Sequence, residues 1–490
     1  MNPHYYIACD LGAESGRVML GTLENQKLEL QEIHRFSNAP ARIMRTYRWN
    51  TLRIFEELKL GLRKVADRGI TPRSLSVDSW GVDYVLTRGR EPQLGIPYNY
   101  RDPRTEATFE AAIKKATAAR IFEATGIQFM AFNTLYQFVA DMEQQPELLA
   151  VADRFLLIGD YFNYLFSGRG VAEESLASTT QIYDPRKRAW SRELIDTFGF
   201  NKAIFPEIVP SGTILGPIQQ DIVEETKLKD VHVIATCSHD TGAAVVAVPA
   251  EGDDWAFLSS GTWSLIGVEL PEPLINDDVR RANFTNEAGH DGTTRFLKNI
   301  SGLWLLQECR RAWAKEGTDY GYEEITWLAL ETEPLRSLVN PNSSRLARPD
   351  HMPRKIQEAC EAQGEPIPET PGQIARCILE SLALTYRVAF EQLRELTGRP
   401  LNRLHIVGGG SQSKLLNQAS ADAIGCTVIA GPVEATAIGN VLVQAIALKD
   451  IASLVELRRT VRDSFPATIY KPRHNEAWEK AFARFRNLSR

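Results

Sequence analysis

The 490-residue chain is predicted to be an α/β protein of two domains, and three observations support this prediction. Short apolar runs of strand length alternate with longer runs of helical spacing, as is typical of α/β proteins. The chain is longer than one hydrophobic core usually allows. A strand–turn–strand unit near the N-terminus is repeated about half a chain later, at residues 254–270, which indicates two related lobes. We place the domains at residues 1–248 and 249–490.

The individual elements follow from the spacing of apolar residues and from turn residues. The first half is predicted to contain strands at 5–9 and 17–21, a helix at 51–67, a strand at 74–77, and helical patterns at 105–124 and 135–153. In the second half, a strand at 404–407 leads through three glycines into a helix at 412–424. Residues 465–475 are interpreted as a linker before a final amphipathic helix.

Composition excludes several classes of protein. The chain has 56 basic and 62 acidic residues, a net charge of −6, so it lacks the basic footprint of a nucleic-acid-binding protein. No apolar stretch is long enough for a membrane span, and no basic leader precedes the first apolar run. Six scattered cysteines form no C-x-x-C pair, which indicates reduced thiols. We therefore expect a cytoplasmic protein, and the net charge does not exclude a local pocket for one nucleotide.

The turn between the first two predicted strands is a candidate phosphate-binding site. The sequence contains no G-x-x-x-x-G-K-[ST] loop, so any ATP must be held by another device. Gly12 and Gly16 allow positive φ angles, which would let successive amide groups converge on an anion. Ser15 adds a hydroxyl group and Arg17 a charge, and Asp10 could hold Mg²⁺ through water. An ordinary β-hairpin with turn glycines is the alternative.

Two further glycine-containing turns have the same character. Ser260, Gly261 and Thr262 lie between two apolar strands in the repeated unit. The glycine triplet centred on Gly409 lies between a strand and a helix, where backbone can approach a flat ligand at a helix N-terminus. Each could be a plain turn. Together the three turns favour nucleotide binding over three unrelated turns.

A candidate catalytic run follows the predicted strand at residues 231–236. It contains His239, Asp240 and Thr241, and it precedes a helical stretch of small residues. Ligands of α/β proteins bind at such carboxyl ends of strands. Asp240 could accept a proton from a hydroxyl group during phosphoryl transfer, or it could simply cap the helix. The run 78–83, with Trp80 among small and acidic residues, could likewise bind a sugar or belong to the core.

These motifs resemble those of the FGGY carbohydrate kinases. The resemblance rests on the runs at residues 10–17, 79–83, 238–241, 259–264 and 405–410, which occur in order along the chain. Supporting runs, at residues 100–102, 126–129, 133–137, 298–307 and 430–435, extend the resemblance over almost the whole length. The resemblance implies two actin-like, ribonuclease-H-like ATPase domains with a ligand cleft between them.

The resemblance also implies roles for individual residues. Those expected to contact ATP are Ala13, Glu14, Ser15, Gly16, Arg17, Thr262, Gln307 and Gly409. Those expected around the sugar are Gly81, His239, Asp240, Thr241 and Asn299, with Asp240 as the proton acceptor. Glu14 departs from the small polar residue expected there, and a carboxylate beside a phosphate site would oppose an anion. Cys360 and Cys377 occupy positions where the family can carry a cysteine pair, and we predict no bond between them.

The implied reaction is ATP-dependent phosphorylation of a ketose, L-rhamnulose, at its 1-hydroxyl group, with Mg²⁺, in rhamnose breakdown. The protein is expected to be a monomer or a small homo-oligomer. Another ketose or polyol, such as L-fuculose or xylulose, is an alternative substrate, because no residue pattern fixes the stereochemistry of a hydroxyl group. A non-enzymatic actin-like sugar sensor is the second alternative.

Overall fold

The computed structural model describes residues 3–89, 91–346, 348, 350–473 and 476–488. The chain divides into two compact units, each built from three separate segments. Unit 1 contains the chain up to Pro249 together with Glu269–Phe296 and Ala435–Ser464. Unit 2 contains Ala250–Val268, Leu297–Glu434 and the chain from Phe465 onward. The division into one domain at residues 1–248 and another at residues 249–490 stays a prediction.

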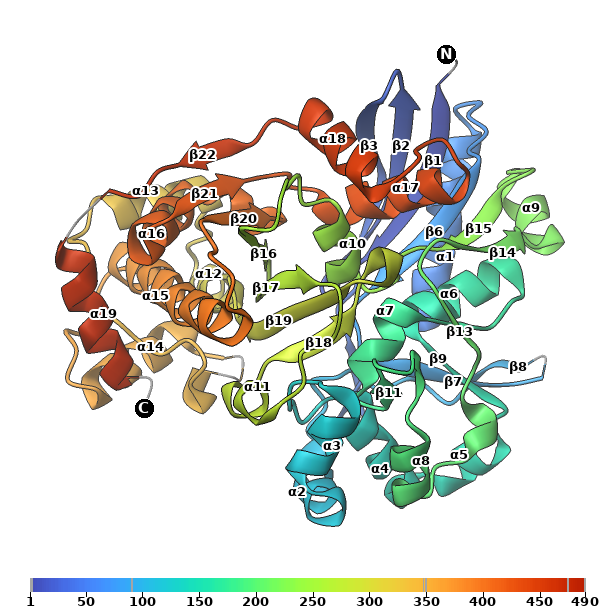
Figure 1. The fold of residues 1–490 in the computed structure, drawn as a ribbon, viewed down its shortest axis with the longest axis horizontal. Coiled ribbons are helices and arrows are strands. Elements are labelled where there is room, and N and C mark those ends of the chain that lie inside the picture. The colour runs from blue at the N-terminus through green and yellow to red at the C-terminus, as the bar shows by residue number, and fades with distance from the viewer. Residues whose placement is uncertain (1–2, 90, 347, 349, 474–475, 489–490) are drawn as a thin grey trace. The chain divides into compact units, whose positions relative to one another are not determined.

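A six-stranded mixed sheet forms the centre of unit 1, with the order β14-β15-β6-β1-β2-β3 (Figure 1). Its strands are β1 (His4–Leu11), β2 (Ser15–Glu24), β3 (Lys27–Ser37), β6 (Ser74–Ser79), β14 (Thr213–Pro217) and β15 (His232–Ala235). Strands β1, β6 and β15 are parallel, so their carboxyl ends lie at one edge of the sheet. Asp10 at the end of β1 is the register partner of Asp78 in β6. Two predicted motifs therefore meet at this edge.

Helix α1 (Thr51–Ala66) shows how the sequence builds the first layer on this sheet. Asn50 caps the helix, since its side chain accepts a hydrogen bond from the amide of Arg53 at 3.2 Å. Its buried apolar residues recur at helical spacing, as predicted from the sequence. Gly61 fits against Val18 of β2, because a Cβ at Gly61 would lie 2.4 Å from a methyl group of Val18.

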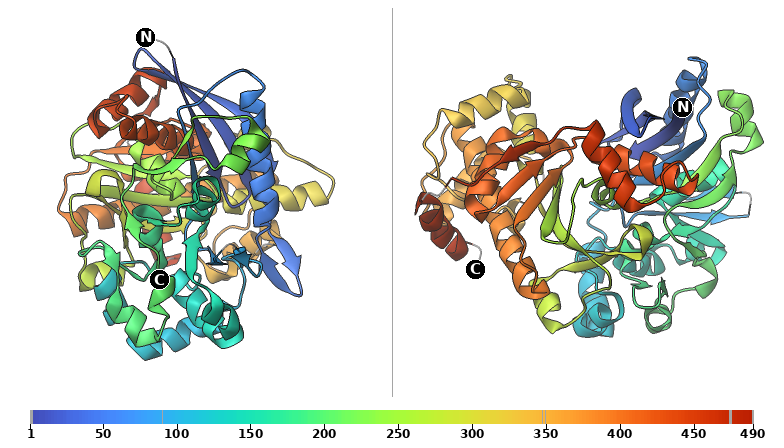
Figure 2. Two further views of the ribbon diagram at one scale, coloured as in Figure 1. Left: turned by 90° about the vertical axis from the view of Figure 1, so that its right-hand side faces the viewer. Right: turned by 45° about the horizontal axis from the view of Figure 1, so that its top comes forward.

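The last segment of unit 1 covers the same sheet with helices from far along the chain. Helix α17 (Ala435–Ala447) contacts β1 and β6, and α18 (Leu454–Ser464) contacts β3. The side chain of Gln444 donates to the carbonyl oxygen of Ile7 at 2.9 Å and accepts from Ser74 at 2.7 Å. In Figures 1 and 2 these red helices lie beside the blue N-terminal strands. Unit 1 is therefore complete only with residues 435–464, near the end of the sequence.

The rest of unit 1 consists of smaller sheets and helices. The β-elements are β4 (Ala41–Ile43), β5 (Thr46–Arg48), β7 (Tyr84–Arg88), β8 (Glu91–Leu94), β9 (Arg154–Leu157), β10 (Ala172–Glu173), β11 (Tyr183–Asp184), β12 (Ala189–Trp190), β13 (Ile208–Val209) and β18 (Thr285–Ala288). The helices are α2 (Thr105–Ala116), α3 (Ala118–Thr125), α4 (Thr134–Gln144), α5 (Pro146–Val151), α6 (Ile158–Ser167), α7 (Glu174–Ala177), α8 (Arg192–Phe198), α9 (Gln220–Thr226), α10 (Asp240–Val246) and α11 (Asp277–Ala282).

A second sheet has the strand order β18-β19-β17-β16-β20-β21-β22, and most of it belongs to unit 2, whereas β18 and the first residues of β19 belong to unit 1. Its other strands are β16 (Trp255–Ser260), β17 (Trp263–Leu270), β19 (Thr294–Ser301), β20 (Arg403–Val407), β21 (Thr427–Ala430) and β22 (Thr468–Tyr470). The helices are α12 (Trp304–Lys315), α13 (Tyr322–Leu330), α14 (Met352–Ala362), α15 (Pro371–Thr397), α16 (Lys414–Ile424) and α19 (Glu476–Leu488). A capping box of Thr370 and Gln373 begins the long helix α15, and Gly398 ends it with a φ of 66°.

The structure confirms the predicted strands and corrects two predicted helical stretches. The stretch at 105–124 is broken because Thr117 adopts a φ of 44° and caps α3. The stretch at 135–153 is broken at Pro146, which begins α5 after the end of α4. Part of the predicted linker at 465–475 forms strand β22, and residues 474–475 lie outside the described part of the chain.

Candidate active site

The first glycine-containing turn joins β1 to β2 and is closed by backbone hydrogen bonds. The amide of Gly12 donates to the carbonyl oxygen of Ser15 at 2.9 Å. Asn38 fixes the turn from outside: its side chain donates to the carbonyl oxygen of Gly12 at 2.9 Å, and its amide donates to that of Glu14 at 2.9 Å. The Glu14 side chain is exposed, so it can lie away from a ligand that the turn binds.

The reason for the glycines in this turn differs from the predicted one. Neither Gly12 nor Gly16 has a positive φ. Gly16 is required by packing instead, because a Cβ there would lie 2.2 Å from the ring of Phe36, its register partner on β3. Gly16 therefore allows β2 and β3 to pack closely at this point.

Two carboxylates lie side by side at the carboxyl ends of β1 and β6. Asp10 forms an ion pair with Arg17, and Asp78 accepts a hydrogen bond from the side chain of Asn440 at 2.6 Å. Burial, and then the negative charge of Asp10, raise the pKa of Asp78 well above its usual range. The second oxygen of Asp78 is buried and has no hydrogen-bond partner in the described part of the chain. Such a pair of carboxylates suits a cation that keeps most of its water.

Asp240 is the first residue of helix α10, directly after the loop that follows β15. One oxygen of its carboxylate accepts hydrogen bonds from the amide and the hydroxyl group of Thr241, the latter at 3.1 Å. Loss of solvation raises the pKa of Asp240, and the charge of Asp10 adds to this effect, while His239 opposes it. The side chain nevertheless keeps 32% of its surface exposed, so a substrate can reach it. A raised pKa improves a carboxylate as a proton acceptor near neutral pH.

His239 is held between Asp240 and a buried ion pair. Its Nε2 atom lies 3.5 Å from the Asp240 carboxylate, and its Nδ1 atom lies 3.2 Å from the Glu287 carboxylate. Arg295 is fully buried, lies 3.1 Å from Glu287, and directs two guanidinium nitrogens at Nδ1 from 3.2 and 3.3 Å. The imidazole is thus fixed on one side, and its Nε2 side is directed to Asp240.

The motif around Gly81 is closely packed and lies beside buried aromatic side chains. A Cβ at Gly81 would lie 2.8 Å from the hydroxyl group of Thr179, so the backbone packs closely there. Trp80 is 6% exposed, packs against Trp49 with ring centroids 4.1 Å apart and the rings tilted by 36°, and donates to Asp83 at 3.0 Å. Of the two roles considered for Trp80, the structure therefore supports the core.

Unit 2 brings together three residues predicted to contact ATP. Thr262, in the turn between β16 and β17, donates to the side chain of Gln307 on α12 at 3.4 Å. The beginning of α12 supports this turn: the amides of Leu303 and Trp304 donate to the carbonyl oxygens of Gly261 and Thr262 at 3.0 and 3.2 Å. A Cβ at Gly302 would lie 2.6 Å from the backbone of the same turn. The turn is thus fixed before any nucleotide binds.

The glycine triplet lies against the same turn. A Cβ at Gly408 would lie 3.0 Å from the carbonyl oxygen of Ser260, and one at Gly410 would lie 2.0 Å from its hydroxyl oxygen. A Cβ at Gly409, by contrast, would have no heavy atom within 4 Å. The flanking glycines are therefore needed for packing, whereas Gly409 faces open space. The contact between Gly409 and ATP stays a prediction.

The predicted site residues are thus divided between the two units. Unit 1 contains Asp10, Ala13, Glu14, Ser15, Gly16, Arg17, Gly81, His239, Asp240 and Thr241, and unit 2 contains Thr262, Asn299, Gln307 and Gly409. Asn299 lies half-buried on β19. Sequence reasoning missed Glu287, Arg295 and the role of Asp78. Asp78 could have been found, because it precedes the motif around Gly81.

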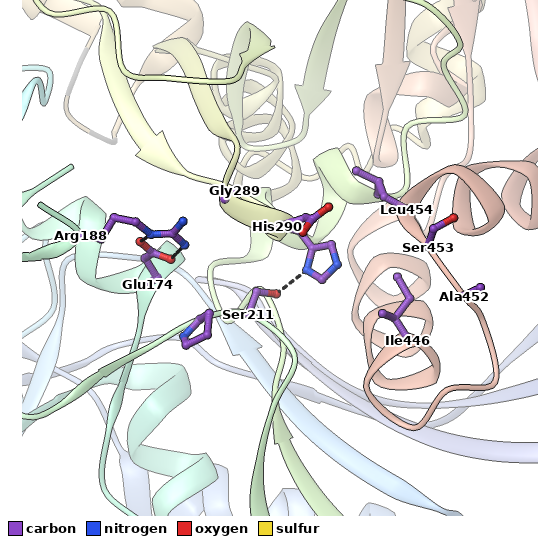
Figure 3. Close-up of a pocket in the computed structure, with 12 residues that line it drawn as sticks. Glu174, Arg188, Ser211, Gly289, His290, Ile446, Ala452, Ser453 and Leu454 are labelled. Atoms are coloured by element: carbon purple, nitrogen blue, oxygen red, sulfur yellow. Dashed lines mark hydrogen bonds and ion pairs between the residues drawn. The ribbon is translucent and has the colours of Figure 1, made fainter. Parts of the chain in front are cut away.

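A separate cavity of about 430 Å³ in unit 1 contains none of these residues. In Figure 3 the imidazole of His290 lies between Ser211 and Leu454, and its Nδ1 atom is 3.0 Å from the hydroxyl group of Ser211. Glu174 and Arg188 form an ion pair at the far side of this cavity. The Ser211 hydroxyl group also lies 3.3 Å from the sulfur of Cys237, just before the loop that carries His239.

The described residues (3–488, with the gaps given above) contain neither a cluster of metal-binding side chains nor a membrane-spanning helix. No group of three or more metal-binding side chains is close enough to enclose an ion there. Within the same residues, no helix combines the length and the apolar character needed to cross a bilayer. Cys360 and Cys377 are both free, with sulfur atoms 3.9 Å apart.

Known proteins with similar sequences cover the whole chain. It is 41% identical over 485 residues to a rhamnulokinase of Bacteroides thetaiotaomicron, covering 99% of each chain. It is 38% identical over 468 residues to a rhamnulokinase of Bacillus subtilis, covering 96% of this chain and 95% of that one.

Solved structures share the fold at lower identity. A gluconate kinase from Lactobacillus acidophilus superimposes with a TM-score of 0.81 at 16% identity, covering 100% of this chain and 97% of that one. A glycerol kinase from Plasmodium falciparum, solved with ADP, gives a TM-score of 0.80 at 14% identity, covering 99% and 98%. Residues 5–247 match the N-terminal domain, and residues 256–448 the C-terminal domain, of the FGGY family of carbohydrate kinases. The predicted two-domain α/β fold is thus confirmed, and the chain belongs to the FGGY family of carbohydrate kinases.

Proposed function

We propose that this kinase transfers the γ-phosphoryl group of ATP to the 1-hydroxyl group of L-rhamnulose, giving L-rhamnulose 1-phosphate and ADP. The observation that carries the proposal is the Asp240 carboxylate, which is accessible, has a raised pKa and adjoins the fixed imidazole of His239. The choice of sugar is supported by the identity of 38–41% to rhamnulokinases over almost the entire length.

In the proposed mechanism, the sugar binds beside Gly81, His239, Asp240, Thr241 and Asn299. His239 positions a sugar hydroxyl group, because its ring is fixed by Glu287 and Arg295. Asp240 accepts the proton of the 1-hydroxyl group as that oxygen attacks the γ-phosphorus and the bond to the β-phosphate oxygen breaks. A positioned base of this kind contributes roughly 10²–10⁴-fold to the rate.

ATP is proposed to contact both groups of residues. In unit 1 the turn from Ala13 to Arg17 provides backbone amides and a guanidinium group. In unit 2 Thr262, Gln307 and Gly409 bind the rest of the ATP molecule. Asp10 is proposed to hold Mg²⁺, and the neighbouring Asp78, with its unbonded oxygen, fits the same ion. When bound, Mg²⁺ would neutralise charge on the transferred phosphoryl group.

The proposal is tested by measuring ADP release with a panel of ketoses and polyols that includes L-rhamnulose, L-fuculose and xylulose. We expect the highest kcat/KM with L-rhamnulose. A higher value with another sugar would assign the chain to a different substrate, and no sugar-dependent ADP release would support the non-enzymatic sensor. Asp240→Asn should bind sugar but lose at least about a hundredfold in kcat, the effect of a lost general base. Near-normal turnover of this variant would remove Asp240 from the proposed role.

A further inference from the structure

The loop that carries His239 and Asp240 rests on the side chains of two buried residues outside it. The backbone amide of Ser238 donates to Oε2 of Glu173 at 3.0 Å. The backbone amide of His239 donates to the hydroxyl oxygen of Ser175, also at 3.0 Å. The Ser175 hydroxyl group in turn donates to the same Oε2 atom of Glu173. Two successive amides of the loop thus depend on one carboxylate oxygen.

Glu173 is itself firmly placed. It is fully buried at the end of β10, where its amide donates to the side chain of Asp160 at 3.1 Å. Its Oε2 atom also accepts from the amide of Ser175 at 3.0 Å, which caps the short helix α7. Its Oε1 atom has no hydrogen-bond partner among the residues that the structure describes. The hydrogen bonds from Ser175 and from the loop are therefore all accepted by Oε2 of Glu173.

We propose that Glu173 is a positioning residue for phosphoryl transfer: its carboxylate holds the amide of Ser238 and, through Ser175, that of His239, and so places the Asp240 carboxylate. This inference rests on the proposed role of Asp240 as proton acceptor. Capping of α7 alone would need only the bond from the Ser175 amide. The two additional bonds lead to the loop, and neither is needed to end or begin a helix of four residues.

The expected size of the effect follows from the geometry. Hydrogen bonds to an ionised acceptor are roughly twice as strong as neutral ones, so the loop is held more firmly than by an amide or hydroxyl group. A displacement of about 1 Å at a reacting group can cost about a hundredfold in rate. Burial raises the pKa of Glu173 to about 7, against the effect of the hydrogen bonds that it accepts.

The next residue, Glu174, provides a matched control. It is 4% exposed and belongs to the same helix, but it pairs with Arg188 and Tyr183. Within the described residues, no hydrogen bond joins its side chain to the loop at 236–240. Replacing Glu174 therefore removes a buried carboxylate and an ion pair while it leaves the support of the loop in place.

The experiment compares Glu173→Ala and Glu173→Gln with Glu174→Ala and Glu174→Gln in the full chain, using whichever sugar the wild type phosphorylates best. We expect Glu173→Ala to lose about a hundredfold in kcat with the KM for ATP changed less than about threefold. Glu173→Gln, which keeps the acceptor and the volume, should recover at least about tenfold of that loss. Both Glu174 variants should keep kcat within about twofold, even where their melting temperature falls.

Two further measurements separate positioning from a general loss of stability. Amide hydrogen exchange at Ser238 and His239 should accelerate in Glu173→Ala but not in Glu174→Ala, and this readout requires no turnover. In an Asp240→Asn background, adding Glu173→Ala should lower kcat by less than about threefold, because Glu173 acts through Asp240.

Equal kcat values for Glu173→Ala and Glu174→Ala, or unchanged exchange at the two loop amides, would overturn the proposal. A full hundredfold further loss on the Asp240→Asn background would overturn it as well. If Glu173→Ala does not fold, the Glu173→Gln variant decides, since it must then show faster exchange at the loop and a lower kcat than Glu174→Gln. A wild-type protein without kinase activity would disprove the proposed function, while the exchange measurement would still test the loop contact.

Discussion

The Glu287 carboxylate lies 3.1 Å from the guanidinium group of Arg295, and both groups are buried against the imidazole of His239. The ion pair thereby fixes a predicted sugar-binding residue with two residues that are not themselves expected to touch the sugar. Each charge needs the other, because a lone buried charge costs several kcal/mol in a protein interior.

This dependence leads to a prediction about stability. Arg295→Met should lower the free energy of unfolding by about 3–5 kcal/mol, because it leaves Glu287 buried without its partner. The double variant Arg295→Met/Glu287→Leu should regain a large part of that loss while sugar binding stays weak, since His239 is no longer fixed. Chemical denaturation and sugar titration of the three proteins check this. A double variant no more stable than the single one would contradict the role of the ion pair.

The raised pKa of Asp240 predicts the acidic limb of the pH profile. A base must be deprotonated to act, and a raised pKa means that the carboxylate takes up its proton at a higher pH than a free aspartate, whose pKa is about 3.9. As the pH is lowered, kcat/KM should therefore begin to fall at a pH above the pKa of a free aspartate. The profile is measured with ADP release from pH 4 to pH 9, and a kcat/KM that does not fall as the pH is lowered to 4 would be inconsistent with a desolvated base.

Gly409 provides a test of nucleotide binding without disturbance of the fold. Because a Cβ there meets no atom within 4 Å, Gly409→Ala should keep the melting temperature of the wild type. If the nucleotide approaches this backbone, the added methyl group should raise the KM for ATP by about tenfold and leave the KM for sugar unchanged, a loss of about 1.4 kcal/mol. An unaltered KM for ATP would place the nucleotide elsewhere.

Gly16 should respond in the opposite way. An added Cβ would lie 2.2 Å from the ring of Phe36, so Gly16→Ala should destabilise the protein by about 1–3 kcal/mol through overpacking. The double variant Gly16→Ala/Phe36→Leu should recover stability, because the smaller side chain makes room. Thermal unfolding distinguishes the cases, and an equally stable single variant would show that β3 can shift to accept the methyl group.

Local patterns predicted much of this molecule, and their failures have physical causes. The strand that carries Asp10 and the strands that flank Thr262 were predicted because apolar alternation and turn glycines are local signals. The break at Thr117 was not, since its positive φ is stabilised by a cap that propensity does not record. The packing role of Gly16 depends on Phe36, which lies 20 positions along the chain and is brought close only by sheet register.

In the candidate site, too, local patterns were predicted and contacts between distant residues were not. Motifs identified His239 and Asp240 because both lie in one short run at the end of a strand. Glu287 and Arg295 contact His239 from strands about 50 residues further along the chain, and no spacing pattern in the sequence predicts that contact. Buried charges are informative only when their partners are known, so these two residues required coordinates.

The contribution of α17 and α18 to unit 1 has a consequence for synthesis of the protein on the ribosome. The sheet of β1, β2 and β6 emerges early, but the helices that cover it, with Gln444 and Val441 against its strands, are made only after residue 434. The apolar surface that these helices cover therefore stays exposed through most of translation. A fragment that stops near residue 296, the end of the second segment of unit 1, should associate with chaperones or aggregate, and adding residues 435–464 as a separate peptide should restore its solubility.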